Sequence, residues 1–265
     1  AGQSVYAATG SSNSIAAGRI SFVLGLHGPC ASYDTACSAA LTACHAALRA
    51  AQLRECATGL VLGVSLMLLP GVGVSFAVAG MTSARGRSHT FDARADGYAR
   101  GEACGAASLD AGVADASIWL LGSAVRQDGK SASLTAPSGR AQQGLLSAAL
   151  ADAGTAPSAL TLSEAHGTGT ALGDPIEAGS FVATVLAARE DGAALPLGGV
   201  KANIGHAEPA AGMTGLLKLV HALRRGRAAP NAQLHALNPH VGAALQGMHK
   251  MLPTQLAAVV SDQAG

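Results

Sequence analysis

Short apolar segments alternate along this 265-residue chain with longer segments rich in Ala and Leu, and this alternation restricts the fold more than any other feature. The short segments, such as Gly59–Leu66 and Cys104–Leu109, have the length and composition of buried strands. The longer segments, such as Ala39–Gln52 and Ala210–Arg224, contain strong helix formers and few helix breakers. Strands that alternate with helices predict an α/β fold.

The other expected elements follow the same alternation. We expect further strands at Gly18–Leu26, Ser117–Val125, Leu160–Glu164 and Leu195–Val200, and further helices at Ala141–Ala153 and Asp174–Glu190. We expect loops at residues 1–17, at residues 126–139, after Leu66 and in the tail from Pro230, where small, polar or glycine-rich sequence prevails.

Residues 57–84 carry no charged side chain, and the segment is long enough to be considered as a membrane span. Pro70 and five glycines interrupt it, and both residue types break helices. We therefore interpret the segment as a buried strand followed by a glycine-rich connection, and we expect no membrane association.

Composition excludes several classes of protein. Apolar residues make up 49% of the chain and charged residues 12%, so much of the chain is expected to be buried. The formal net charge of +1 gives no reason to expect nucleic acid as a partner. The five cysteines are an odd number without a CxxC pair, which favours reduced thiols over disulfides or a zinc site. We therefore expect a reducing, intracellular and cytoplasmic location.

Cys37 lies where an extended segment is expected to give way to the helix at Ala39–Gln52. The first backbone N–H groups of a helix lack partners, and the helix dipole is positive there. This setting favours a thiolate, so Cys37 is a candidate nucleophile. A buried structural cysteine remains the alternative, because a free thiol packs like a small hydrophobic group.

Two histidines occupy similar loops, each between an expected strand and an expected helix. His166 lies in Glu164–Thr170, and His206 ends Lys201–His206. Ligands of open α/β sheets bind at the carboxyl ends of the strands. A single histidine in such a place is more often structural, but two of them together with Cys37 indicate a reactive centre.

Other chemistries fit the sequence less well. The glycines at 167, 169 and 173 give GxGxxxG instead of the dinucleotide pattern GxGxxG, and neither a phosphate-binding loop nor a GxSxG motif is present. A metal would need a third ligand, which no nearby Asp, Glu or His supplies, so we expect none. A Cys-His-Asn protease would not explain two matching histidine loops. We interpret most charges in Arg85–Glu102 as solvent-exposed.

Six segments together resemble the β-ketoacyl synthase (ketosynthase) domain of modular polyketide synthases. They are DTACSAAL (34–41), FDARADGYARGE (91–102), SAVRQDG (123–129), LTAPSG (134–139), EAHGTGTALGDPIEA (164–178) and KANIGHAEPAAG (201–212). The similarity runs from about Ile15 to His240. It implies a thiolase-like fold, in which two related halves pack as α/β/α/β/α layers.

The resemblance also implies roles for particular residues. Cys37 matches the acyl-accepting nucleophile, and His166 and His206 match the paired histidines. The supporting Lys and Glu of the family match Lys201 and Glu208. The positions near the pantetheine arm match Thr168 and Thr170, and we include Asn203 among the expected substrate-binding residues.

The implied reaction is a decarboxylative Claisen condensation of a Cys-bound acyl group with a malonyl-type thioester. The implied partner is an acyl carrier protein, whose phosphopantetheine carries the substrates, and no cofactor is expected on this domain. The family also implies a homodimer for the full-length protein. The resemblance divides the chain into the remainder of an N-terminal half (1–125) with Cys37 and most of a C-terminal half (126–265) with both histidines.

The two ends and two local positions depart from the family pattern. Ala39 and Ala40 replace serines, and Pro209 replaces an alanine, changes that we expect to be mild. We expect the fold to be incomplete, because a long N-terminal portion precedes the matching region in the family. Residues 248–265 do not match the family's Gly-Phe-Gly-Gly loop, which donates an oxyanion-hole N–H. Two alternatives therefore stay open: a non-catalytic remnant that pairs with a partner, and a fatty-acid or thiolase-like condensing enzyme.

Overall fold

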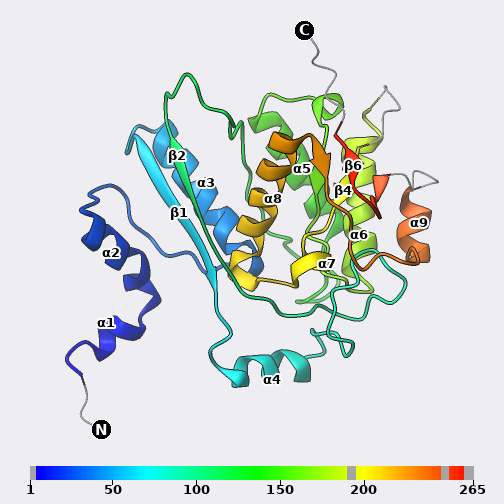
Figure 1. Ribbon diagram of the computed structural model, residues 1–265, viewed down its shortest axis with the longest axis horizontal. Coiled ribbons are helices and arrows are strands. Elements are labelled where there is room, and N and C mark those ends of the chain that lie inside the picture. The colour runs from blue at the N-terminus through cyan, green and yellow to red at the C-terminus, as the bar shows by residue number, and fades with distance from the viewer. Residues whose placement is uncertain (1–3, 190–194, 246–250, 260–265) are drawn as a thin grey trace.

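The computed structural model describes residues 4–189, 195–245 and 251–259, and they form a mixed arrangement of helices and short sheets (Figure 1). The helices are α1 (Ala7–Ser11), α2 (Asn13–Leu24), α3 (Ala39–Gln52), α4 (Pro70–Val78), α5 (Gly139–Asp152), α6 (Gly173–Phe181), α7 (Lys201–Ile204), α8 (Ala211–Arg225) and α9 (Pro239–Leu245). Short helical turns lie at η1 (Ala36–Ser38), η2 (Pro157–Ala159), η3 (Val182–Leu186) and η4 (Glu208–Ala210).

Within the described residues the strands pair as three two-stranded sheets. Antiparallel β1 (Thr58–Ser65) and β2 (Ala103–Asp110) form the longest ladder, with Thr58 opposite Asp110 and Ser65 opposite Ala103. The others are the parallel pair β3 (Ser163–Glu164) with β4 (Leu197–Gly198) and the antiparallel pair β5 (Arg227–Ala228) with β6 (Ala257–Ala258).

The inward face of β1 packs against α3 and α8. Alternate residues of β1 are buried, as expected for a strand with one covered face. Ala40 and Cys44 of α3, Val61 of β1 and Met213 of α8 form this small core. A Cβ added at Gly63 would lie 3.0 Å from the Cβ atoms of both Ala40 and Met213, so the glycine allows the close approach of the three elements.

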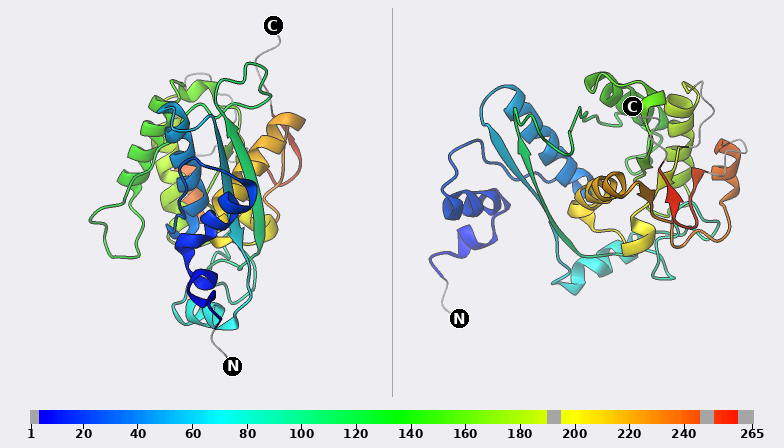
Figure 2. Two further views of the ribbon diagram at one scale, coloured as in Figure 1. Left: turned by 90° about the vertical axis from the view of Figure 1, so that its left-hand side faces the viewer. Right: turned by 45° about the horizontal axis from the view of Figure 1, so that its top comes forward.

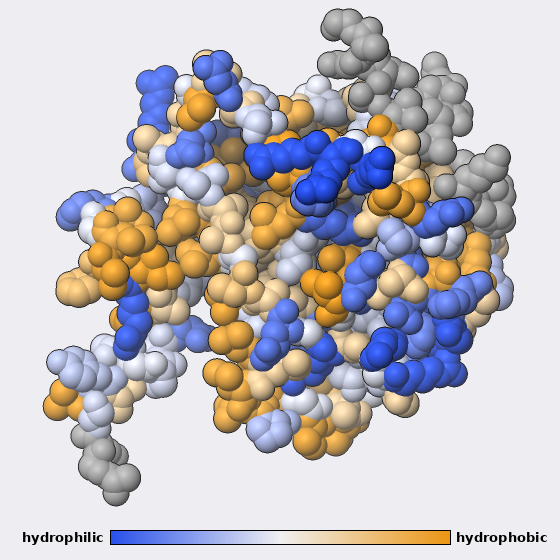
Figure 3. All heavy atoms as spheres, viewed as in Figure 1, coloured by the Kyte–Doolittle hydropathy of each residue, from blue (hydrophilic) through white to orange (hydrophobic). Residues whose placement is uncertain are grey.

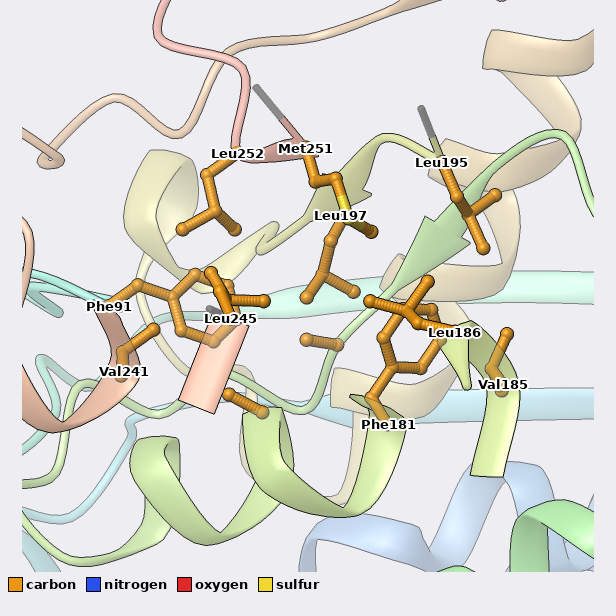
Figure 4. Packing of buried hydrophobic residues seen from close by; sticks show 12 residues of the cluster. Phe91, Phe181, Val185, Leu186, Leu195, Leu197, Val241, Leu245, Met251 and Leu252 are labelled. Carbon is orange, nitrogen blue, oxygen red and sulfur yellow. The ribbon is translucent and has the colours of Figure 1, made fainter. Parts of the chain in front are cut away.

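The larger core surrounds β4 (Figure 4). Its labelled side chains come from distant segments and point toward one another; they are Phe91, Phe181, Val185, Leu186, Leu195, Leu197, Val241, Leu245, Met251 and Leu252. This core fixes the position of α6, and therefore of the loop that precedes it.

The first helices stand apart from the rest of the molecule. In Figure 1 and in the right view of Figure 2, α1 and α2 lie beside the β1–β2 ladder, away from the main body. Neither helix contains a buried residue. The described residues contain no helix that is both long enough and apolar enough to cross a membrane.

Several expected elements are confirmed. The predicted helices at Ala39–Gln52, Ala141–Ala153 and Ala210–Arg224 correspond to α3, α5 and α8, and the strands at Gly59–Leu66 and Cys104–Leu109 correspond to β1 and β2. The strands expected at Leu160–Glu164 and Leu195–Val200 are present as the shorter β3 and β4.

The expectations for the first 26 residues were wrong. The loop expected at residues 1–17 contains α1 and the start of α2, apart from residues 1–3, which lie outside the described residues. Residues 18–24 of the strand expected at Gly18–Leu26 form the second part of α2. This helix ends at Gly25, whose φ of 66° lets its N–H bond back to the carbonyl of Ser21.

Other expectations also need correction. The segment Ser117–Val125 forms no strand, because the Ser123 N–H donates to the Asp152 carboxylate of α5 instead of to a neighbouring strand. The glycine-rich connection after Leu66 contains α4, which begins at Pro70, a residue favoured in the first helical turn. The tail from Pro230 contains α9. The helix expected at Asp174–Glu190 begins one residue earlier and becomes a π turn at η3, and Glu190 lies outside the described residues.

Candidate active site

The structure brings Cys37, His166 and His206 together. Their potential ligand atoms all lie within 4.8 Å of one another, and Cys37 Sγ lies 3.7 Å from His166 Nε2. The two imidazole rings meet edge to face, with centroids 5.7 Å apart. The expectation that His166 and His206 approach Cys37 is therefore confirmed, although 129 residues separate Cys37 from His166.

Cys37 occupies the turn η1 immediately before α3. The preceding residue, Ala36, has a φ of 52°, in the left-handed region that residues with a Cβ rarely adopt. This turn presents the half-buried thiol beside the first N–H groups of α3. Cys44 is buried within α3, where desolvation raises the pKa of its thiol. A buried structural cysteine, the alternative considered for Cys37, is therefore found at Cys44 and not at Cys37.

Two carboxylates of α6 hold the loop that carries His166. Glu177 accepts hydrogen bonds from the backbone N–H groups of His166, at 2.5 Å, and Gly167, at 2.8 Å. Asp174 accepts from Gly169 at 3.1 Å and from Phe91 at 2.8 Å. Burial raises the pKa of Asp174 to about 7, against the effect of these N–H donors. The sequence analysis missed Asp174 and Glu177 as part of the site, although both lie in the motif EAHGTGTALGDPIEA.

The glycines of this loop allow another segment of the chain to approach closely. A Cβ on Gly167 would lie 2.6 Å from Thr90 Cγ2, and one on Gly169 would lie 2.7 Å from the His89 nitrogen. Both glycines also have positive φ. The segment at residues 88–90 therefore packs directly against these two glycines, where a side chain would not fit.

Lys201 lies directly behind His166. Its Nζ is 3.4 Å from His166 Nδ1 and also donates a hydrogen bond to the His166 carbonyl. Burial lowers the pKa of Lys201, while the negative charge of Glu177 opposes this change. Lys201 is buried and begins the short helix α7, where the sequence had predicted a loop.

Both imidazoles are neutral at physiological pH. Desolvation by the surrounding protein atoms and the nearby charge of Lys201 lower the pKa of His166 to about 3, although part of the residue is accessible to solvent. Burial and Lys201 likewise lower the pKa of His206 to about 3. A neutral imidazole carries a single N–H, so its tautomer decides which nitrogen donates.

Hydrogen-bond partners assign the same tautomer to both rings. The backbone N–H of Glu208 donates to His206 Nδ1 at 2.8 Å, so the remaining proton of His206 belongs on Nε2. The ammonium of Lys201 faces His166 Nδ1 and can only donate, which places the proton of His166 on Nε2 as well. Both rings thus direct N–H groups, and not lone pairs, into the space beside Cys37.

This tautomer assignment bears on metal binding. Cys37 supplies the third ligand that the sequence analysis could not find, and the three ligand atoms are close enough for one ion. A metal needs the lone pair on each ligating nitrogen. Binding at both Nε2 atoms would move each proton to Nδ1, against the N–H of Glu208 and the ammonium of Lys201. The arrangement therefore fits a hydrogen-bond donor pair better than a metal centre.

The other expected site residues lie near this centre. Thr168 and Thr170 face each other with hydroxyl oxygens 3.2 Å apart, and Thr170 also accepts from the Gly173 N–H. Glu208 follows His206 and pairs with Arg100. Asn203 donates to the carbonyl of Pro230 at 3.1 Å, so the structure gives its amide a structural partner. Its expected contact with substrate stays a prediction, as do those of the two threonines.

Most charged side chains in Arg85–Glu102 are exposed, as expected, and Asp92 and Arg100 are the exceptions. Asp92 is completely buried and accepts hydrogen bonds from Arg94 and from the backbone N–H groups of His235 and Ala236. Although burial opposes ionisation, these donors lower the pKa of Asp92. The Arg100 side chain is only 14% exposed. Their positions in the motif FDARADGYARGE were the only signal that the sequence offered.

A Cys-His-His centre on this α/β scaffold defines a condensing-enzyme type of site, and comparisons with known families agree. Residues 1–112 match the family model "Beta-ketoacyl synthase, N-terminal domain", and residues 117–235 match "Beta-ketoacyl synthase, C-terminal domain". The chain belongs to the β-ketoacyl synthase family.

Its curated relatives include two different polypeptides of the phenolphthiocerol/phthiocerol polyketide synthase of Mycobacterium tuberculosis. One is 44% identical over 245 residues, which cover 90% of this chain and 11% of that protein. The other is 43% identical over 257 residues, which cover 94% of this chain and 16% of that protein. The chain therefore spans a small part of these relatives.

Solved structures of similar fold are ketosynthase domains. An oxazolomycin ketosynthase domain of Streptomyces albus superposes with a TM-score of 0.88 at 35% identity, covering 96% of this chain and 45% of that one. The ketosynthase from module 6 of the Bacillus subtilis bacillaene synthase gives 0.87 at 32% identity, covering 99% and 48%. These neighbours confirm the expected thiolase-like fold, of which this chain spans about half.

Proposed function

We propose that this chain carries the reactive centre of a polyketide β-ketoacyl synthase, an acyltransferase that joins an acyl group to a malonyl-type unit. The observation that carries the proposal is the pair of neutral imidazoles directing Nε2–H groups into the space beside Cys37. The printed names of the relatives favour polyketide over fatty-acid chemistry.

In the first step Cys37 accepts the acyl group. The thiolate attacks the thioester carbonyl of an acyl-phosphopantetheine on a carrier protein, a new C–S bond forms, and the pantetheine thiolate leaves. The position of Cys37 before the first turn of α3 supports this step, because negative charge is stabilised at a helix N-terminus.

In the second step a malonyl-type thioester loses carbon dioxide. The electron pair of the broken C–C bond moves into an enolate, whose oxygen accepts hydrogen bonds from His166 and His206. Donors that are oriented in advance toward developing charge supply a large part of the catalysis in such sites. The neutral state of both rings suits this task, because each can donate at physiological pH.

In the third step the enolate carbon attacks the acyl carbonyl on Cys37. A C–C bond forms, the Cys37 thiolate leaves, and the product is a β-ketoacyl thioester. Lys201 holds His166 in place behind this reaction. The chemistry requires no resident cofactor, and the phosphopantetheine of the carrier protein holds both substrates. All five cysteines are free thiols, which suits a reducing compartment.

A pantetheine probe with a chloroacetyl group tests this proposal directly. We expect alkylation at Cys37, and we expect Cys37→Ala to abolish labelling. A matched control is Cys104→Ala, which removes an exposed thiol outside the site and should leave labelling unchanged. Labelling that persists in Cys37→Ala at the wild-type rate would contradict the proposal.

A non-catalytic partner-binding protein is the second candidate, because much apolar surface is exposed. Leu60, Leu62 and Val64 of β1 are exposed on the outward face of the ladder. Decarboxylation of a malonyl thioester separates the two candidates, since a binding protein would release no carbon dioxide. A rate that is equal in the wild-type chain and in a His166→Ala/His206→Ala variant would favour the binding protein.

A further inference from the structure

Arg100 makes a side-chain ion pair with Glu208, which lies two residues after His206. Its guanidinium donates two hydrogen bonds to the carboxylate of Glu208, from Nε to Oε1 at 2.5 Å and from Nη2 to Oε2 at 3.0 Å. The two side chains are only 14% and 17% exposed. A fork of two parallel hydrogen bonds fixes the orientation of both groups, and partial burial shields it from solvent.

Glu208 needs such an anchor, because its backbone is strained. Its φ is 45°, in the left-handed region that residues with a Cβ rarely adopt. Strained residues of this kind persist only where the surrounding structure holds them. In this conformation the Glu208 N–H donates to His206 Nδ1 at 2.8 Å. The bond that sets the His206 tautomer thus comes from a strained residue whose side chain is held by Arg100.

Arg100 is itself fixed on other sides. Its neighbours bind the backbone of His206: the His206 N–H donates to the Ala99 carbonyl at 2.7 Å, and the Gly101 N–H donates to the His206 carbonyl at 2.8 Å. The guanidinium also lies over the ring of Phe76 in α4, with Cζ 5.4 Å from the ring centroid. Arg100 is therefore held by the backbone segment at residues 99–101, which pairs with His206, and by Phe76 of α4.

We propose that Arg100 is a positioning residue of the active site. By anchoring the Glu208 side chain, it keeps the strained Glu208 N–H on His206 Nδ1 and so keeps the proton of His206 on Nε2, where it points toward Cys37. The consequence for condensation rests on the proposed function, whereas the tautomer of His206 is a property of the folded chain that needs no turnover.

Nitrogen-15 NMR of histidine-labelled chain measures the tautomer, with His206→Gln used to assign the signals. In the wild type we expect the neutral Nε2–H pattern for His206 at pH 7. In Arg100→Gln we expect loss of that single pattern and a mixture of tautomers. A wild-type His206 in the Nδ1–H form, or an unchanged pattern in Arg100→Gln, would overturn the proposal.

Arg49→Gln is the matched control. Arg49 also pairs with a carboxylate, that of Asp152, at 2.7 Å, but this pair lies outside the Cys-His-His cluster. We expect the Nε2–H pattern of His206 to survive in this variant, and its loss there would show a general response to a lost ion pair. If Arg100→Gln does not fold, Arg100→Lys takes its place, since it keeps the charge but not the fork; an unchanged pattern there would overturn the proposal.

A double variant tests the strain directly. Glycine adopts positive φ without steric cost, so Arg100→Gln/Glu208→Gly should recover much of the Nε2–H pattern. Arg100→Gln/Glu208→Gln removes the unpaired charge but keeps the strain, and we expect no recovery. If the Nε2–H pattern returned with Glu208→Gln but not with Glu208→Gly, the charge of Glu208 and not its backbone position would govern the tautomer of His206, and the proposal would fail. Labelling of Cys37 tests the proposed function separately, so either idea can fail alone.

Discussion

At the scale of single residues, the site depends on which nitrogen of each histidine carries the proton. Lys201 and the Glu208 N–H occupy the Nδ1 atoms of His166 and His206, which leaves Nε2–H groups toward Cys37. Motif and spacing identified the three reactive residues. They could not identify the tautomers, because the partners that fix them are placed by backbone geometry.

We predict that Cys37 is the first thiol to react with limited iodoacetamide. It lies at a helix start beside His166, whereas burial raises the pKa of Cys44 and slows its reaction. Mass spectrometry of the digested chain measures the order of modification. The exposed Cys30 and Cys104 serve as internal references for simple accessibility. Faster modification of either would argue against an activated thiol at Cys37.

We predict that His206 makes the stability of the chain depend on pH. Its pKa is about 3 in the folded state and about 6.5 in an unfolded chain, so the unfolded chain binds the extra proton between these values. The free energy of unfolding should therefore fall as the pH drops from about 6.5 toward 3, with a contribution of up to about 1.4 kcal/mol per pH unit. Above pH 6.5 this contribution to the free energy of unfolding does not change with pH.

Urea unfolding at several pH values, on the wild type and on His206→Gln, measures this contribution. Glutamine does not titrate, so the difference between the two stability curves separates His206 from His166, Asp92 and Asp174, which titrate in or near the same range. Parallel curves between pH 3 and 6.5 would show that His206 is not held in its neutral form.

At the scale of elements, the approach of α3, β1 and α8 places Cys37 against the histidines. Two turns meet at the centre of this packing, since η1 carries Cys37 and η4 follows His206. Glycine at position 63 lets β1 approach both helices, with Ala40 on one side and Met213 on the other. Tight packing of these elements is thus a condition for the site.

We predict that Gly63→Val destabilises the chain by about 1–3 kcal/mol, because overpacking forces neighbouring atoms apart. The added Cβ alone would lie 3.0 Å from two other Cβ atoms. Ala106→Val is the control, since Ala106 lies opposite Leu62 on the exposed face of the ladder. Chemical denaturation measures the free energy of unfolding of both variants. Equal values would show that the backbone at Gly63 can shift to accommodate the added side chain.

At the scale of the whole molecule, the described chain leaves much apolar surface uncovered. Leu60, Leu62 and Val64 face outward from β1, and β1 and β2 are each hydrogen-bonded on one side only within the described sheets. Figure 3 shows further apolar surface over α2 and α4, where Phe22, Val23 and Val78 are exposed. Unpaired strand edges and apolar patches of this kind favour association with another chain.

We therefore predict that the 265-residue chain self-associates. Light scattering across a concentration series measures its solution mass. Leu62→Lys places a charge in the outward face and should lower the mass, whereas Leu134→Lys changes a fully exposed loop residue and should not. A chain that stays monomeric across the whole concentration series would contradict this prediction.

The sequence by itself determined several of the local elements and the identity of the reactive residues. The helix after Cys37 and the strand Cys104–Leu109 follow from propensity and periodicity, which act over a few residues. The histidines were found because each lies in a motif beside a recognisable strand and helix. These features depend on neighbours in the chain, and such neighbours are visible in the sequence.

Only the tertiary structure decided which distant groups meet. The Arg100–Glu208 pair joins residues 108 positions apart, and Asp92 is buried in a segment whose composition is typical of a solvent-exposed loop. The segment Gly18–Leu26 has the composition of a strand but lies in α2, because no partner strand pairs with it among the described residues. Burial and pairing arise from packing between remote segments, and local sequence does not encode them.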